Sequence, residues 1–120
     1  MPTRRANRVN DLLREELSDL ILRQLRDPRL AVVVSITEVV TSPDFRSAKV
    51  HVSTLGDDAE KEQTLQALRS AAAFLRRSLK PRLAMKNVPF LTFHRDDSIE
   101  EGAHLSALID EVNPPPESGE

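Results

Sequence analysis

The chain has 120 residues, of which 39 % are hydrophobic and 30 % charged, and its formal net charge at pH 7 is −2. This length suffices for one compact core, and the absence of cysteine excludes disulfides, thiolate nucleophiles and cysteine-rich zinc sites. Apolar runs stay short of the roughly 18 residues that span a bilayer, and no apolar signal-peptide segment follows the basic amino terminus. We therefore expect a soluble, cytoplasmic protein with no membrane partner.

The first half of the chain predicts a helix followed by a β-hairpin. Apolar residues recur at three- and four-residue steps over residues 4–25, and Pro28 ends this helix because the residue before a proline avoids helical geometry. Residues 32–41 are rich in β-branched side chains, and their apolar phase is lost near Glu38, which favours a bulge there. Residues 47–55 alternate apolar and polar, and the turn-forming segment before them joins the two strands into a hairpin.

The second half predicts a long helix and a third strand. The helix begins after Gly56 with acidic residues in its first turn, where the helix dipole favours them. Pro81 ends or kinks this helix. Its apolar stripe consists of Leu65, Leu68, Ala72, Leu75 and Leu79. Residues 89–95 form the third strand, with Phe90 and Phe93 on opposite faces, so that at least one of them belongs to the core.

The carboxyl-terminal segment predicts one more helix and a tail. Ser98 and Glu101 have the spacing of a capping box, which begins a short helix that reaches about residue 112. Residues 113–120 are rich in proline and acidic, which is typical of a disordered tail. We therefore expect a single domain over residues 1–112.

The order of these elements predicts an α+β fold. Helices alternating with a small three-stranded sheet form a two-layer sandwich, and the strand-helix-helix-strand order of residues 47–95 is that of a KH-type RNA-binding unit of type II. The three glycines lie far apart in the sequence, which excludes a phosphate-binding P-loop, a dinucleotide fingerprint and the GxxG loop that KH domains use to hold RNA.

The distribution of charge indicates a binding surface for RNA. Residues 63–95 hold seven basic side chains and no acidic one, and residues 96–120 hold eight acids and no base. A run this long cannot pair its charges locally, and Lys and Arg side chains contact phosphates with release of counterions. On one continuous helix Arg69, Arg76 and Lys80 would share a face. The candidate RNA-binding residues are Arg69, Arg76, Arg77, Lys80, Arg82 and Lys86, with Arg4, Arg5 and Arg8 as auxiliaries. The alternative is a solvated surface paired with nearby acids.

Catalytic and metal chemistry find little support in the sequence. The three histidines lie on different predicted elements without metal-ligand spacing, and no serine lies in a nucleophile elbow. The acidic cluster of Asp96, Asp97, Glu100 and Glu101 could hold Mg²⁺, but a turn and a helix start also explain it. We expect no catalytic residue, no metal and no cofactor. Because Tyr and Trp are absent, we also expect phosphate contacts, and not base stacking on the sheet, to dominate binding.

An ordered series of segments resembles the ribosome-binding factor A family. The segments are Arg8-Val9 with Leu12-Leu13 and Glu16-Leu17, Asp27-Pro28-Arg29-Leu30, Ile36-Thr37-Glu38-Val39 with Ser42-Pro43-Asp44, Ala48-Lys49-Val50-His51-Val52, Phe74-Leu75-Arg76, Val88-Pro89 with Leu91 and Phe93, and Asp97-Ser98-Ile99-Glu100 with Gly102. The resemblance implies a KH-like type II fold in which a helix-kink-helix replaces GxxG. It further implies a non-catalytic bacterial factor that binds the small ribosomal subunit and its rRNA, assists late maturation of 16S rRNA near its 5′ end, and is needed in the cold.

One position departs from that family's pattern. The family's kink carries Ala-x-Gly, whereas the matching segment here is Ala71-Ala72-Ala73. Because alanine favours helix over glycine by roughly 1 kcal/mol, we expect a kink that is shallower or displaced toward Pro81. Ribosomal proteins are further candidate partners, and we expect a monomer. Two alternatives remain open: a self-associating or protein-interaction module with two oppositely charged regions, and a metal-dependent ribonuclease built on the acidic cluster.

Overall fold

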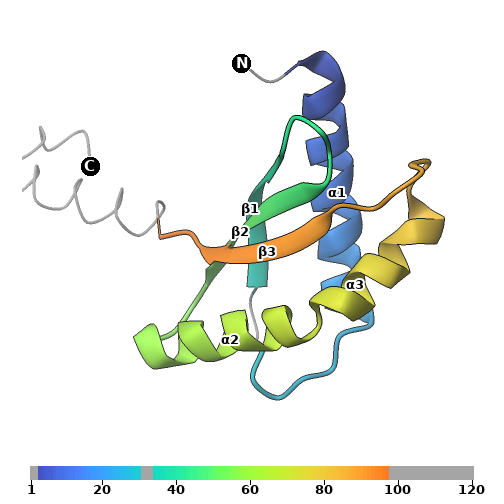
Figure 1. The fold of residues 1–120 in the computed structure, drawn as a ribbon. Helices are drawn as coiled ribbons and strands as arrows, with labels where there is room; N and C mark the ends of the chain where they lie inside the picture. The colour runs from blue at the N-terminus through green and yellow to red at the C-terminus, as the bar shows by residue number, and fades with distance from the viewer. Residues whose placement is uncertain (1–2, 31–33, 98–120) are drawn as a thin grey trace, which may run out of the picture.

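The computed structural model describes residues 3–30 and 34–97, and three helices pack against a three-stranded sheet (Figure 1). The elements in chain order are α1 (Arg4–Arg23), β1 (Val34–Thr41), β2 (Ser47–Thr54), α2 (Asp58–Ser70), α3 (Ala72–Leu79), a 3₁₀ turn η1 (Lys80–Arg82) and β3 (Phe90–Arg95). The predicted α+β class and the three predicted strands are confirmed. The predicted helices before the first strand and between the second and third strands are confirmed as well. The predicted last helix, its Ser98 capping box and the tail lie outside the described residues, so the 1–112 domain boundary stays a prediction.

The sheet has the order β1-β2-β3 and mixes two kinds of pairing. β1 pairs with β2 in antiparallel register, which confirms the predicted hairpin, and the register shifts between Ile36 and Glu38, which confirms the predicted bulge. β2 pairs with β3 in parallel register, with Val50 opposite Phe93. A parallel pair needs a crossover connection, and α2, α3 and η1 supply it.

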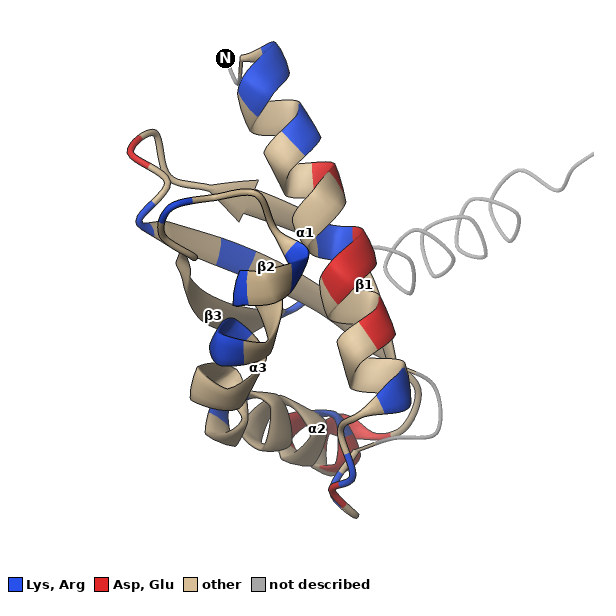
Figure 2. Ribbon diagram, turned by 90° about the vertical axis from the view of Figure 1, so that its right-hand side faces the viewer, with Lys and Arg blue, Asp and Glu red and all other residues tan. Residues whose placement is uncertain are grey.

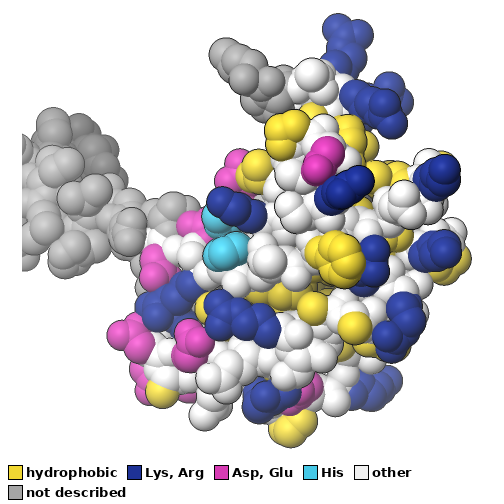
Figure 3. Space-filling model, viewed as in Figure 1, with side chains coloured by type: hydrophobic (Ala, Val, Ile, Leu, Met, Phe, Trp, Pro, Cys, Tyr) yellow, Lys and Arg dark blue, Asp and Glu magenta, His cyan; other side chains and the backbone are white. Residues whose placement is uncertain are grey.

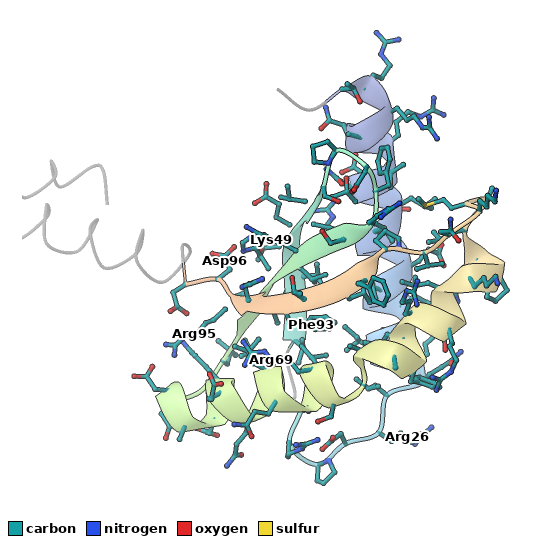
Figure 4. The ribbon with its side chains drawn as sticks, in the orientation of Figure 1. Arg26, Lys49, Arg69, Phe93, Arg95 and Asp96 are labelled. Carbon is teal, nitrogen blue, oxygen red and sulfur yellow. The ribbon has the colours of Figure 1, made fainter. Side chains whose placement is uncertain are left out.

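The core lies on one face of the sheet. Ala48, Val50 and Val52 alternate with exposed or half-buried residues along β2, and Phe93 of β3 is 2 % exposed whereas Phe90 is 63 % exposed. α1 packs against β1, and α2 and α3 pack against β3, so the buried face is covered by all three helices. Figure 4 shows Phe93 among these side chains. The predicted division of the two phenylalanines between the faces is confirmed.

A break at Ala71 divides the predicted long helix into α2 and α3. Ala71 has φ −92° and ψ 0°, and its N–H is shared between the carbonyl oxygens of Ala67 and Leu68, each 3.1 Å away. The kink therefore stays in the alanine segment; of the two expectations, displacement toward Pro81 is wrong, and a shallower kink stays a prediction. On either side of the break, Leu68 and Leu75 are fully buried. The bend lets both helices direct their apolar stripes into the same core.

Polar side chains hold the start of α2 and the amino-terminal half of α1 in place. Asp57 accepts a hydrogen bond from the Glu60 N–H, and Glu60 accepts one from the Asp57 N–H, which completes a capping box at the start of α2. Asn10 of α1 accepts hydrogen bonds from the Thr41 N–H (3.1 Å) and the Thr41 hydroxyl (2.7 Å). These bonds keep α1 beside the β1–β2 hairpin. Within the described residues, no helix is long and apolar enough to cross a membrane.

The burial of leucine side chains predicts which substitutions lower the free energy of unfolding. Leu75→Ala removes a fully buried side chain just after the break and should lower the free energy of unfolding by about 2–5 kcal/mol. Leu22→Ala, at a side chain that is 81 % exposed, should change it by less than about 0.5 kcal/mol. Urea unfolding followed by circular dichroism measures both values, and equal losses in the two variants would contradict this assignment of the core.

Candidate nucleic-acid interface

A cleft of about 590 Å³ opens where α1 begins, the β1–β2 turn projects and the chain enters β3. Cations and aromatic rings line it, with Asp44 as its one carboxylate among the described residues. We call it the basic cleft and define it by Arg5, Phe45, Arg46, Arg76, Lys86 and Phe90. In Figure 3, Lys and Arg side chains gather on the side of the molecule that carries the start of α1 and α3, while acidic side chains gather near the start of α2. Figure 2 shows the same basic side from a second direction.

Arg76 is fixed in the wall of this cleft. Its Nε donates a hydrogen bond to the Val88 carbonyl oxygen at 2.9 Å, and its guanidinium carbon lies 3.9 Å from the centroid of the Phe90 ring. Such a cation–π contact orients the guanidinium and leaves its other N–H groups for a ligand. Within residues 3–30 and 34–97, Arg76 forms no ion pair. An arginine that is positioned but not neutralised is suited to contact a phosphate.

Two more predicted cations, Arg77 and Lys80, extend the cleft from Lys86 into a basic rim formed by these three residues. A second hollow of about 210 Å³ is lined by Arg76, Arg77, Lys80 and Lys86, and it shares Arg76 and Lys86 with the basic cleft. Arg77, Lys80 and Lys86 are exposed, and none is paired with a carboxylate among the residues that the structure describes. The structure thus brings these three together with Arg76, as the sequence predicted.

The amino terminus of α1 contributes to the same site. The Arg5 guanidinium carbon lies 5.4 Å from the centroid of the Phe45 ring. Arg4 and Arg8 are exposed on the same end of this helix. The three predicted auxiliary cations therefore lie together at the amino-terminal end of α1, and of the three Arg5 lines the cleft.

Two predicted residues lie elsewhere and are paired. Arg82 donates to Glu16 Oε1 at 3.0 Å and Asp19 Oδ2 at 2.7 Å, tying η1 to the middle of α1. The hydrogen bond from Arg82, with a second from Arg23, lowers the pKa of Asp19, and Asp19 then Glu16 raise the pKa of Arg82. The sequence run lacks acids, but its partners come from α1, which lies more than sixty residues earlier.

Arg69 also has a place different from the one expected. It donates to Glu62 Oε1 at 3.2 Å and to the Phe93 carbonyl oxygen at 3.0 Å, so it joins α2 to β3, as Figure 4 shows. Because the helix breaks at Ala71, Arg69 and Arg76 belong to different helices, and the expected single face with Lys80 does not form. Arg69 and Arg82 are therefore first of all structural ties.

Three residues of the basic cleft were not predicted from the sequence. Phe45 and Arg46 lie in a turn, and Phe90 was predicted only to face away from Phe93. A hydrogen bond of 2.8 Å from the Phe90 N–H to the Arg46 carbonyl oxygen holds the turn against β3. The opposite faces of Phe90 and Phe93 in the sequence already indicated that one of the two rings could be exposed and available to a ligand. The approach of Phe45 depends on a turn conformation that the sequence does not indicate.

Two histidines and two acids of the predicted candidates lie in the described residues, and each has a neighbour within the fold. His51 and His94 are neighbours in register, with ring centroids 5.8 Å apart. Burial, and then the charges of His51, Lys49 and Arg69, lower the pKa of His94. Asp96 bonds Thr37, and Asp97 pairs with Arg95. Among the described residues no group of three or more His, Cys, Asp or Glu could hold a metal ion; Glu100 and Glu101 lie outside them.

Comparison with known proteins points to one family. Residues 5–109 match the family described as ribosome-binding factor A. A relative of that name from Clostridium tetani is 41 % identical over 108 residues, covering 90 % of this chain and 89 % of the relative. A solution NMR structure from Thermotoga maritima, assigned to ribosome-binding factor A, superposes with a TM-score of 0.71 at 34 % identity over 83 % of this chain and 94 % of that one.

A third similarity concerns a structure placed in an assembly. A homology model of Thermus thermophilus ribosome-binding factor A, fitted into the cryo-EM map of a complex of that factor with the 30S subunit, matches with a TM-score of 0.62. The identity is 28 %, over 73 % of this chain and 91 % of that one. Together with the observed helices and sheet, these similarities agree on a KH-like α+β architecture.

The pairing of Arg82 makes a prediction that is independent of any ligand. Arg82→Gln should lower the urea midpoint at pH 7, because it leaves Glu16 and Asp19 without this cation. Since the folded-state pKa of Asp19 is lowered, the stabilisation is fully present above its ordinary pKa of 3.8 and is lost as the pH falls through the folded-state value. The difference between wild type and Arg82→Gln should therefore shrink in acid. Arg77→Gln, at an exposed and unpaired cation, is the control, and a midpoint as low as that of Arg82→Gln would refute the distinction.

Proposed function

The chain belongs to the ribosome-binding factor A family, and on that premise we propose that it is a non-catalytic cytoplasmic factor that binds the small ribosomal subunit during assembly. The relative from Thermus thermophilus that was fitted into a 30S complex supports this proposal, because its fold matches over 73 % of the chain. The finer role that we propose is assistance to late maturation of 16S rRNA near its 5′ end, with a growth requirement in the cold. Ribosomal proteins are further partners on this proposal, and the factor acts as a monomer.

The basic cleft and its rim are the observation that carries the proposal. Arg5, Arg76, Arg77, Lys80 and Lys86 lie together without a carboxylate partner in residues 3–30 and 34–97. Each phosphate that such a cation neutralises releases counterions, which gives an affinity that falls steeply with salt. The net charge of −2 does not oppose this, because the local field and not the total decides where a polyanion docks.

The lining of the cleft suits binding better than catalysis. Among the described residues that line it there is no histidine, serine or threonine, and the one carboxylate is Asp44. Hydrogen bonds from the Ser42 hydroxyl and the Arg46 N–H lower the pKa of Asp44, so it stays ionised and occupied within its turn. A factor of this kind acts by binding one conformer of the RNA more tightly than others, which shifts the population toward that conformer.

Removing the rim cations tests the proposal. The triple variant Arg77→Gln/Lys80→Gln/Lys86→Gln should bind purified small subunits more weakly than wild type. The dependence of log affinity on log salt should become shallower by about two to three, at roughly 0.7–0.9 for each lost phosphate contact. Wild type should prefer immature over mature subunits. Sedimentation binding assays over a salt series measure all three quantities.

A matched variant removes the same charge elsewhere. Arg14→Gln/Arg23→Gln/Arg26→Gln alters three exposed cations that line neither the basic cleft nor its rim, so its salt slope should equal that of wild type. Equal effects of the two triple variants would mean that only net charge matters, and the cleft would lose its role. If wild type binds no subunit and instead self-associates in a salt-suppressed way, the interaction module is correct. Turnover of RNA with Mg²⁺ would favour the ribonuclease.

A further inference from the structure

The turn that carries Phe45 is held in a backbone conformation that large side chains rarely adopt. Phe45 has φ +59°, and it is the one residue other than glycine with positive φ among those that the structure describes. For a bulky residue this is an outlier, whereas asparagine and glycine adopt it readily. The Phe45 N–H donates to the Ser42 carbonyl oxygen at 2.9 Å, and Asp44 Oδ1 accepts from the Arg46 N–H at 3.1 Å. Backbone strain of this kind is concentrated at functional sites, where neighbouring groups hold the residue in place.

The strain places an aromatic ring where the cleft already has another. The chain has four aromatic residues, and two of them, Phe45 and Phe90, line the basic cleft. Phe90 is 63 % exposed, although burial in the core is the usual place for so large an apolar side chain. Each ring lies beside an arginine, Arg5 for Phe45 and Arg76 for Phe90. The cleft therefore offers flat apolar and cationic surfaces together.

Flat apolar and cationic surfaces together fit an unpaired RNA base with its flanking phosphates better than they fit a phosphate alone. Unpaired bases stack on aromatic rings and on the planes of arginine guanidinium groups, while backbone phosphates bind cations beside them. The volume of about 590 Å³ lies within the roughly 300–1,000 Å³ range of small-ligand pockets. An acidic protein segment would use the cations but would gain nothing specific from two phenyl rings.

We propose that the basic cleft holds an unstacked base of single-stranded RNA against Phe45, Phe90 and Arg76, with Arg46 and Lys86 on the flanking phosphates. The proposal deepens the proposed function and rests on it for the class of ligand. Asn87 and Asp44 are the polar uncharged and acidic side chains in the lining, so the cleft has few groups with which to read base edges. Stacking there tolerates any base, and the cleft selects for an unpaired nucleotide more than for a sequence. This is a single stacking site at the edge of the fold, distinct from stacking across a sheet.

The test separates the base from the phosphates. Wild type is titrated with a single-stranded oligoadenylate and with an abasic ribose-phosphate oligomer of equal length and charge. Wild type should bind the oligoadenylate on the order of tenfold more tightly, as expected for one stacked base. Phe45→Asn and Phe90→Leu should abolish most of this ratio and keep the salt slope. The triple rim variant should weaken both oligomers alike and reduce the slope.

The positive φ of residue 45 also provides a control for the folding of the Phe45 variant. Asparagine accepts positive φ, so Phe45→Asn should melt at or above the temperature of wild type while losing the base-dependent affinity. A large drop in its melting temperature would mean that the ring serves packing, and would overturn the proposal. Phe74→Leu removes an aromatic ring of α3 that does not line the cleft, and its ratio should equal that of wild type.

The outcomes distinguish the two proposals. If wild type binds small subunits but binds both oligomers equally, the assembly role stands and base stacking is overturned. If the base-dependent ratio is present and is lost in Phe45→Asn and Phe90→Leu while subunit binding is absent, the stacking site stands and the assembly role fails. If the ratio is present but survives both substitutions, the bases stack elsewhere and this site is wrong.

Discussion

A sheet of three strands has to bury one face, and in residues 3–30 and 34–97 the helices α1, α2 and α3 cover it. That constraint places the other features. The helical run after Gly56 divides at Ala71, and Leu68 before the break and Leu75 after it are both fully buried. The bend directs α3 toward α1, and the segment after α3 then returns along the cleft to enter β3. The cleft is thus a by-product of how the crossover has to be packed.

The same packing sorts the cations into two groups. Arg69 and Arg82 join elements that are far apart in sequence. Arg69 pairs with Glu62 of its own helix and donates to the Phe93 carbonyl oxygen of β3, and the half-buried Arg82 pairs with Glu16 and Asp19 of α1. The second group is exposed at the end of α3 and in the segment after it, and consists of Arg77, Lys80 and Lys86. Arg76 shares features of both groups, because Val88 and Phe90 hold its guanidinium in place without neutralising its charge. A count of positive charges in residues 63–95 therefore overstates the charge that a polyanion would meet.

The sequence predicted the parts of this structure that depend on local periodicity. Alternation over Ala48, Val50 and Val52 placed β2 and its buried face, and the loss of phase near Glu38 placed the bulge. The sequence did not predict the partners of Arg82, because an ion pair with Glu16 and Asp19 depends on tertiary packing. The break at Ala71 was expected only through the family resemblance, because alanine itself favours helix. The sequence did not predict the roles of Phe45 and Arg46, because positive φ is usual for glycine or asparagine and a phenylalanine gives no indication of it.

The parallel pairing of β2 with β3 also sets an order of assembly for the molecule itself. The β1–β2 hairpin can close within about 1–10 μs, because its strands adjoin in sequence. β3 pairs with β2 across the longer connection of α2, α3 and η1, and we expect this non-local pairing to form more slowly than the hairpin. Phe90, which completes the cleft, is the first residue of β3, and its N–H bonds Arg46 across that last junction. We therefore expect a partly folded chain to carry the basic charges but no cleft, so that discrimination between ligands appears only when folding is complete.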